Sequence, residues 1–166
     1  EWEDLVRILR DYGEERKARA ISRAIVERRE KAPIQTTRQL GRLVQDVVGS
    51  GGRRIHPATR TFQALRIAVN DEIGQIERFL EPAIRSLSPG GRIAVISFHS
   101  LEDRIVKRFF KAEAKGCTCP PSLPVCVCGK KPLIRLLTRR VVRPRKAEID
   151  ANPMARSTRL RAAEKL

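Results

Sequence analysis

The feature that most limits what this sequence can fold into is a short, mainly apolar run at residues 92–98. A turn, Ser88-Pro89-Gly90-Gly91, precedes the run, and a helical pattern over residues 101–111 follows it. A strand, a short loop and a helix in this order imply a parallel sheet, whose strands are buried on both faces. The sequence therefore predicts an α/β fold with residues 92–98 as a buried strand.

Periodic apolar residues predict three helices near the start of the chain. The first ends near Gly13, the second is bounded by Pro33, and the third begins after Thr36 and Gln39, which resemble a capping box. The Gly-rich stretch at residues 49–52 follows a helix rather than a strand. It therefore predicts a flexible connection and not a loop that cradles phosphate.

Pro57 suits the first turn of a long helical segment, in which an apolar periodicity runs from Phe62 to Leu87. This length is unusual for one globular helix, so the pattern favours two joined helices. Asn70–Asp71 and Pro82 are the weak points, because a proline inside a helix removes a hydrogen bond and should kink its surroundings.

The last part of the chain is less regular. Residues 134–142 favour a strand, and residues 147–153 favour a loop or one helical turn. In a final predicted strand, Thr158 and Leu160 alternate with Arg159 and Arg161. Because side chains alternate between the two faces of a strand, this pattern predicts a basic outer face.

The charge of the chain points to a polyanionic partner. The net charge is +16, and 26 of the 35 basic residues are arginines, whose planar guanidinium matches phosphate well. From Gly129 onward the net charge is +9 in 38 residues. No apolar run approaches the roughly 20 residues that a bilayer requires. We therefore expect a soluble, cytoplasmic protein with nucleic acid as partner and no membrane contact.

The segment Ser97-Phe98-His99-Ser100 ends the predicted strand. Ligands of open parallel sheets bind beyond the carboxyl ends of the strands, so this position favours a functional site. The alternative is structural: Ser100, with Asp103 three residues later, caps the next helix, Ser97 bonds local backbone and His99 packs at the surface.

Four cysteines cluster in a Pro-rich stretch as Cys117-x-Cys119 and Cys126-x-Cys128. Four thiolates converging on a tetrahedral zinc ion would hold a stretch that has almost no core of its own. The spacing differs from the usual pair of Cys-x-x-Cys motifs, so reduced free thiols and a redox disulfide stay open as alternatives.

Arg60 and Arg66 flank Gln63 near the start of a predicted helix. Backbone NH groups and guanidiniums at such a position can both meet phosphate. The alternative is a solvated helix whose arginine stems cover apolar neighbours.

Three segments resemble the bacterial RsmH (MraW) family closely: HPATRTFQALRIAVNDE at residues 56–72, GGRIAVISFHSLEDRIVKRFF at 90–110 and NPMARSTRLR at 152–161. Enzymes of this family methylate the exocyclic N4 amine of a cytosine in small-subunit (16S) ribosomal RNA with S-adenosylmethionine. The resemblance implies the second half of a class I, Rossmann-like methyltransferase sheet with an inserted helical domain.

The resemblance also implies a division of the chain. Residues 1–68 would form the helical insert that recognises the RNA substrate, and residues 69–166 the C-terminal half of the catalytic core. The sequence opens at Glu1 inside a helical pattern and without Met, which indicates a piece of a longer protein. The family's cofactor-binding residues would lie upstream of Glu1, so this chain alone should be inactive.

Position and charge, rather than the resemblance, select the candidate residues. We expect Ser97 and His99 to line the catalytic pocket. The arginines expected to contact RNA are Arg60, Arg66, Arg104, Arg108, Arg159 and Arg161. The alternative function is a non-enzymatic, basic RNA-binding module with a structural zinc loop, and a homodimer stays open as a further partner.

Overall fold

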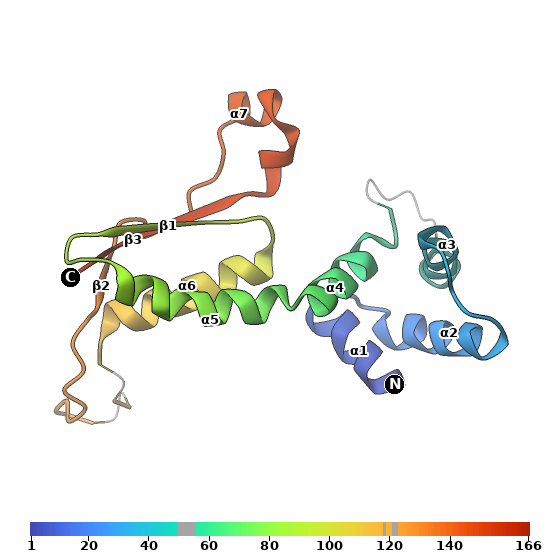
Figure 1. Ribbon diagram of the computed structural model, residues 1–166, viewed down its shortest axis with the longest axis horizontal. Helices are drawn as coiled ribbons and strands as arrows, with labels where there is room; N and C mark the ends of the chain where they lie inside the picture. The colour runs from blue at the N-terminus through green and yellow to red at the C-terminus, as the bar shows by residue number, and fades with distance from the viewer. Residues whose placement is uncertain (50–55, 118, 121–122) are drawn as a thin grey trace. The chain divides into compact units, whose positions relative to one another are not determined.

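A computed structural model describes residues 1–49, 56–117, 119–120 and 123–166 of the chain (Figure 1). The chain divides into two compact units, Glu1–Glu72 and Ile73–Leu166. Within the described residues, no helix combines the length and the apolar character needed to cross a membrane.

The first unit is helical. Its helices are α1 (Trp2–Asp11), α2 (Ala18–Lys31), α3 (Thr37–Val48) and α4 (Thr59–Asn70). The three helices expected before residue 49 are therefore confirmed. Their shared core holds buried apolar residues from all four helices and from the residue before α4: Leu5, Leu9, Ala18, Ile21, Ile25, Val44, Val48, Ala58 and Ala64.

Local signals set the helix ends in this unit. The Thr36 hydroxyl accepts a hydrogen bond from the Gln39 NH at 3.2 Å, and the Gln39 side chain accepts one from the Thr36 NH at 3.1 Å. The predicted capping box is confirmed. A Cβ atom at Gly13 would lie 2.9 Å from the carbonyl oxygen of Arg60, so glycine permits the end of α1 to touch the start of α4. Gly49 ends α3 with φ of +82°, and the other residues of the predicted connection, 50–52, lie outside the described residues.

The long periodic segment forms two joined helices, as predicted. Asp71 ends α4 in the left-handed conformation, with φ of +49°, and α5 (Glu72–Ser86) begins directly after it. Pro82 lies inside α5, which continues to Ser86, so the proline does not end the helix.

The second unit combines helices with a small sheet, so the chain is an α/β protein. The strands β1 (Arg92–Ser97), β2 (Ile134–Leu136) and β3 (Arg159–Lys165) pair in the order β1-β3-β2, and both pairings are antiparallel. The parallel sheet expected from the strand, loop and helix pattern is therefore not present in the described residues. Among the described residues β1 is an edge strand, and its neighbour is β3, from the C-terminal end of the sequence.

Helices α5 and α6 (Ser100–Lys115) lie on one side of this sheet (Figure 1). The core between them contains Leu80, Ile84, Val106, Phe110, Ile134 and Ala163. On β1, Ile93 and Val95 pack against this core, whereas Ile96 is 57% exposed. The prediction that β1 is buried on both faces is wrong for the described residues, because the helices cover one face only.

The strand predicted at residues 134–142 is shorter than expected. β2 ends at Leu136, and further along only Val142 forms a bridge, to Leu160. The turn predicted at 147–153 corresponds to the short helix α7 (Lys146–Ala151), which the 3-10 helix η1 (Pro153–Ser157) follows.

Candidate functional site

The segment between β1 and α6 is tightly organised. Ser97 is the last residue of β1 and is buried. His99 is the N-cap of α6, and its ring nitrogen Nδ1 accepts a hydrogen bond from the Glu102 NH at 3.4 Å. Nε2 of the same ring lies 3.2 Å from a Glu102 carboxylate oxygen. The structure thus brings the two predicted pocket residues to the carboxyl end of one strand.

Glu102 completes the cap from the other side. Its carboxylate accepts hydrogen bonds from the backbone NH of Phe98 at 2.7 Å and of His99 at 3.1 Å. Burial raises the pKa of Glu102, but the hydrogen bonds from the His99 side chain and from these two NH groups outweigh it and hold the pKa below its ordinary value. The loop after β1 is therefore held in one conformation by a charged carboxylate.

The cap predicted at Ser100 is wrong by one residue, because His99 has this role. His99 with Glu102 and Ser100 with Asp103 have the same spacing, and residue preference favours serine as a cap. In the structure the Asp103 carboxylate binds Arg161, so it does not complete a capping box with Ser100. Glu102 and Asp103 were both missed as site residues, although the spacing of Glu102 from His99 was a usable signal.

Replacing Glu102 by alanine should lower the free energy of unfolding by about 1 kcal/mol at pH 7, because two backbone NH groups lose their acceptor. The pKa of Glu102 is lowered by folding, so its stabilisation is complete above the ordinary carboxyl pKa of about 4.3 and is lost as the pH falls further. Urea unfolding of both proteins at pH 7 and in acid measures this. The exposed Glu77→Ala is the matched control, and an equal difference at both pH values would contradict the role of Glu102.

Arg161 does not belong to a basic outer face, and this prediction is wrong. Its side chain points to α6, where Nε lies 2.7 Å from Oδ1 of Asp103 and Nη2 lies 3.1 Å from Oδ2. Both side chains are largely buried, with exposures of 11% and 13%. The alternation of side chains along the sequence identified the two faces of β3 correctly, but it did not show which of the two faces turns inward. Arg161 therefore connects the sheet to the first turn of α6.

The other five arginines expected at RNA have different surroundings. Arg104 and Arg108 are exposed on α6, and Arg159 is partly exposed on β3. Arg60 donates a hydrogen bond to the carbonyl oxygen of Glu14 at 3.3 Å. Arg66 forms a two-point ion pair with Glu72, at 2.8 and 3.1 Å. All five lie at least partly at the surface.

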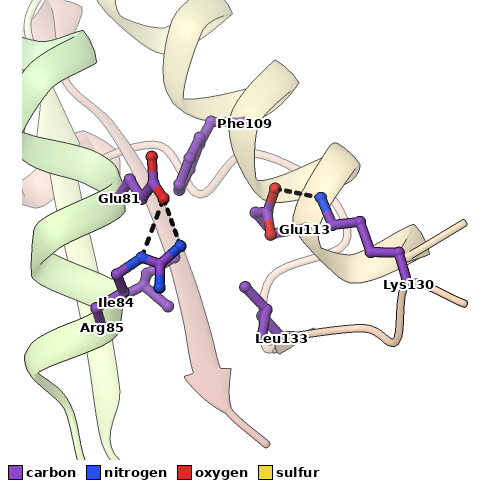
Figure 2. Close-up of a pocket in the computed structure, with 7 residues that line it drawn as sticks. All are labelled: Glu81, Ile84, Arg85, Phe109, Glu113, Lys130 and Leu133. Atoms are coloured by element: carbon purple, nitrogen blue, oxygen red, sulfur yellow. Dashed lines mark hydrogen bonds and ion pairs between the residues drawn. The ribbon is translucent and has the colours of Figure 1, made fainter. Parts of the chain in front are cut away.

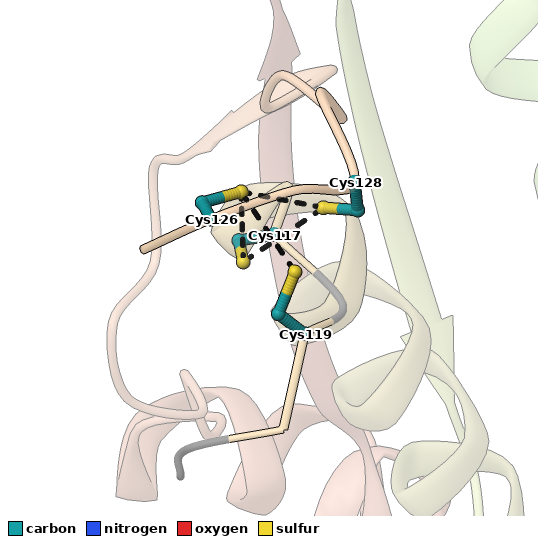
Figure 3. Close-up of side chains that lie close together, drawn as sticks. All are labelled: Cys117, Cys119, Cys126 and Cys128. Atoms are coloured by element: carbon teal, nitrogen blue, oxygen red, sulfur yellow. Dashed lines mark hydrogen bonds between the residues drawn. The ribbon is translucent and has the colours of Figure 1, made fainter. Parts of the chain in front are cut away.

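The four cysteine sulfurs lie together in the loop that follows α6 (Figure 3). Four of the six Sγ–Sγ distances run from 3.5 to 3.9 Å, and all four Sγ atoms lie within 4.8 Å of one another. All four are free thiols. The backbone NH of Cys119 lowers the pKa of the Cys117 thiol, but the neighbouring sulfurs, Cys126 first, outweigh it and raise the pKa to about 11.

A cavity of about 300 Å³ lies between α5, α6 and residues 130–133 (Figure 2). Ile84, Phe109 and Leu133 form its apolar lining. Its two carboxylates already have partners, since Glu81 binds Arg85 at 2.7 Å and Glu113 binds Lys130 at 2.9 Å. The cavity therefore offers apolar surface and satisfied ion pairs, and it lies apart from the loop after β1.

Comparisons with known proteins give one consistent result. The model of the MraW methylase family matches residues 1–166. The chain is 57% identical to the ribosomal RNA small subunit methyltransferase H of Symbiobacterium thermophilum, over the whole chain and 54% of that relative. It is 58% identical to the protein of the same name from Geobacter sulfurreducens, over 98% of the chain and 53% of the relative. The chain spans about half the length of the curated relatives it matches.

Proposed function

This chain belongs to the MraW methylase family, and we propose that it acts within a longer protein as part of an S-adenosylmethionine-dependent ribosomal RNA methyltransferase. The reaction is transfer of the cofactor's methyl group to the exocyclic N4 amine of a cytosine in 16S ribosomal RNA. The family match over all 166 residues carries this proposal. A cytoplasmic location follows, because the substrate is bacterial ribosomal RNA.

The edge position of β1 supports the Rossmann-like part of the proposal. One edge of β1 pairs with β3, and its outer face leaves Ile96 57% exposed, with Phe98 just beyond the strand 58% exposed. Large apolar side chains on an edge strand are an aggregation hazard unless another element covers them. Further parallel strands beside β1, with helices on the second face, would complete a class I methyltransferase sheet and bury both side chains.

Ser97 and His99 are proposed to line the substrate pocket. The cytosine amine is a weak nucleophile because its lone pair is delocalised into the ring, so a base turned out of its stack must be oriented accurately. The cap formed by His99 and Glu102 fixes the loop that carries His99 and directly follows Ser97, the last residue of β1. In this proposal the fixed loop supplies orientation, and the base is held for in-line attack on the methyl group.

The residues described here do not fit S-adenosylmethionine. The cavity of Figure 2 has its carboxylates paired with Arg85 and Lys130. It also lacks the glycine-rich backbone that approaches a nucleotide in this kind of fold. We therefore assign none of its residues to the cofactor and propose that the complete protein supplies that site from other residues.

RNA recognition is proposed for residues 1–68 and for the basic residues of the remainder, 69–166. Of the six candidate arginines, the exposed Arg104 and Arg108 and the partly exposed Arg159 are the ones in the second unit that phosphate can reach. Arg60 and Arg66 would contribute from the first unit only by sharing or exchanging their present partners. Arg161 is not included, because Asp103 neutralises it in a buried position.

The test compares the complete protein with this chain. The complete protein should form N4-methylcytidine in 16S ribosomal RNA, detected by mass spectrometry of nuclease digests. This chain alone should bind S-adenosylmethionine weakly or not at all in calorimetry. Micromolar binding by the chain would contradict the placement of the cofactor site. Complete protein that binds RNA but transfers no methyl group would favour the alternative, a non-enzymatic RNA-binding module.

A zinc ion bound by the four cysteines would stabilise the cysteine loop and would take no part in methyl transfer. The loop follows the C-terminus of α6, whereas His99 caps the N-terminus of the same 16-residue helix. A helix of this length separates its ends by about 24 Å. The homodimer that the sequence leaves open stays a prediction.

A further inference from the structure

We propose that Cys117, Cys119, Cys126 and Cys128 bind one structural zinc ion. The first observation is the distance between the sulfurs. Four sulfurs at about 2.3 Å from one zinc ion form a tetrahedron with edges of about 3.8 Å. Four of the six Sγ–Sγ distances, from 3.5 to 3.9 Å, match this edge. The sulfurs thus surround a space of the size that a single ion fills (Figure 3).

The same distances distinguish a zinc site from a disulfide and from an iron–sulfur cluster. A disulfide requires one sulfur pair at about 2.05 Å and gives the other two sulfurs no reason to approach it. Here all four cysteines are free, and their sulfurs converge within 4.8 Å of one another. An iron–sulfur cluster would push its ligands apart, because several iron and sulfide ions lie between them. A four-sulfur tetrahedral set for one ion is typical of zinc.

The surroundings show why the loop needs a metal. Val125 and Val127 are 71% and 77% exposed, and the core of the second unit contains no described residue of the cysteine loop. A chain segment without a core cannot offset its loss of conformational entropy by hydrophobic burial. Metal coordination supplies that free energy directly in small loops.

The base of the loop is held independently of the cysteines. Gly116 has φ of +69°, and a Cβ atom there would lie 2.5 Å from the Pro132 nitrogen. The Leu133 NH donates to the Glu113 carbonyl oxygen at 3.0 Å, and Lys130 pairs with the Glu113 side chain. Removing the metal should therefore release the loop and leave the rest of the unit folded.

The chemistry of the site is ligand exchange without redox change. Each thiol loses its proton as its sulfur binds, so one Zn²⁺ replaces up to four protons and the loaded site carries a charge of −2. Lys115 and Lys131 flank the cysteines in a chain of net charge +16, which favours this anionic site. All four positions are filled by protein, so the ion has no open position for a substrate. The assignment does not depend on methyl transfer.

The experiment measures metal in the 166-residue chain, purified with reductant and without chelator. Elemental analysis should find about one zinc per chain. Cobalt(II) added to the metal-free chain should give the visible absorption of a tetrahedral thiolate site. Cys119→Ser and Cys126→Ser should each lose the zinc and the cobalt spectrum. Val127→Ser, an exposed non-ligand in the same loop, should retain both.

Three results would overturn the proposal. These are a chain that takes up neither zinc nor cobalt, iron in place of zinc at the four cysteines, and disulfides in protein kept under reductant. Far-UV circular dichroism shows whether a serine variant has unfolded. If it has, the cobalt spectrum of the unmodified chain still decides, because that measurement requires no variant.

Discussion

Replacing Arg161 by glutamine should lower the free energy of unfolding of the second unit by about 3 kcal/mol. The variant leaves the Asp103 carboxylate largely buried without its cation, and breaking such a pair from one side costs far more than an exposed pair contributes. Asp103→Asn should have a comparable effect for the converse reason. Hydrogen exchange of peptides from β1, β3 and α6 measures the loss in the unit concerned.

Three controls separate the effect of this buried pair from a general effect of charge. Arg159→Gln removes the same charge two residues away on β3, from a partly exposed position, and should change stability by less than about 0.5 kcal/mol. Trp2 is the only tryptophan of the chain and lies in the first unit, so its fluorescence should be unchanged in Arg161→Gln. The double variant Asp103→Leu with Arg161→Met should recover much of the loss. Equal effects of Arg159→Gln and Arg161→Gln would contradict the buried pair.

Local sequence signals predicted the helical part of the chain well, because each signal acts over a few residues. The capping box of Thr36 and Gln39 satisfies backbone groups within one turn, and it is found where the sequence placed it. The break at Asp71 has a similar local basis, since Asp71 ends α4 in the left-handed conformation and its NH donates to the Ile67 carbonyl oxygen. Neither feature depends on what packs beside it.

The sheet could not be predicted in the same way. Which strands pair, and which face of a strand turns inward, depends on residues that are distant in the sequence. The pattern around β1 indicated a strand correctly, but its partner, β3, comes from the end of the chain, more than 60 residues later. Arg161 shows the same limit for a single side chain. Its charge favoured the outer face, and only the position of Asp103 on α6 makes the inner face stable.

The cysteine cluster depends both on local spacing, which the sequence shows, and on the path of the loop, which the sequence does not show. Their spacing in the sequence left zinc, free thiols and a disulfide open, because spacing alone does not say whether the sulfurs of the two pairs meet. In the structure the turn of the loop places Cys126 3.5 Å from Cys117 and 3.9 Å from Cys119, which are nine and seven residues earlier. This convergence is the information that the sequence lacks.

RNA binding by the chain should weaken steeply with salt. The net charge of +16 implies that phosphate contacts and the release of counterions dominate the affinity. With about six phosphate contacts on single-stranded RNA, the slope of log affinity against log salt should be about −4, which is a loss of roughly 300-fold between about 50 and 200 mM salt. Fluorescence anisotropy with a labelled 16S fragment measures this, and an unrelated RNA of equal length should bind with nearly the same affinity.

Paired variants then locate the contacts. Arg104→Gln with Arg108→Gln removes two exposed cations from α6 and should reduce the slope by about 1.4, at about 0.7 per phosphate. Arg161→Gln should leave the slope unchanged wherever the protein stays folded, because Asp103 already occupies its guanidinium. Arg16→Gln with Arg19→Gln tests two exposed arginines at and just before the start of α2 as an alternative RNA-binding surface in the first unit. Affinity that is insensitive to salt over this range would contradict the electrostatic account. Strong preference for the 16S fragment would show instead that this chain reads RNA shape by itself.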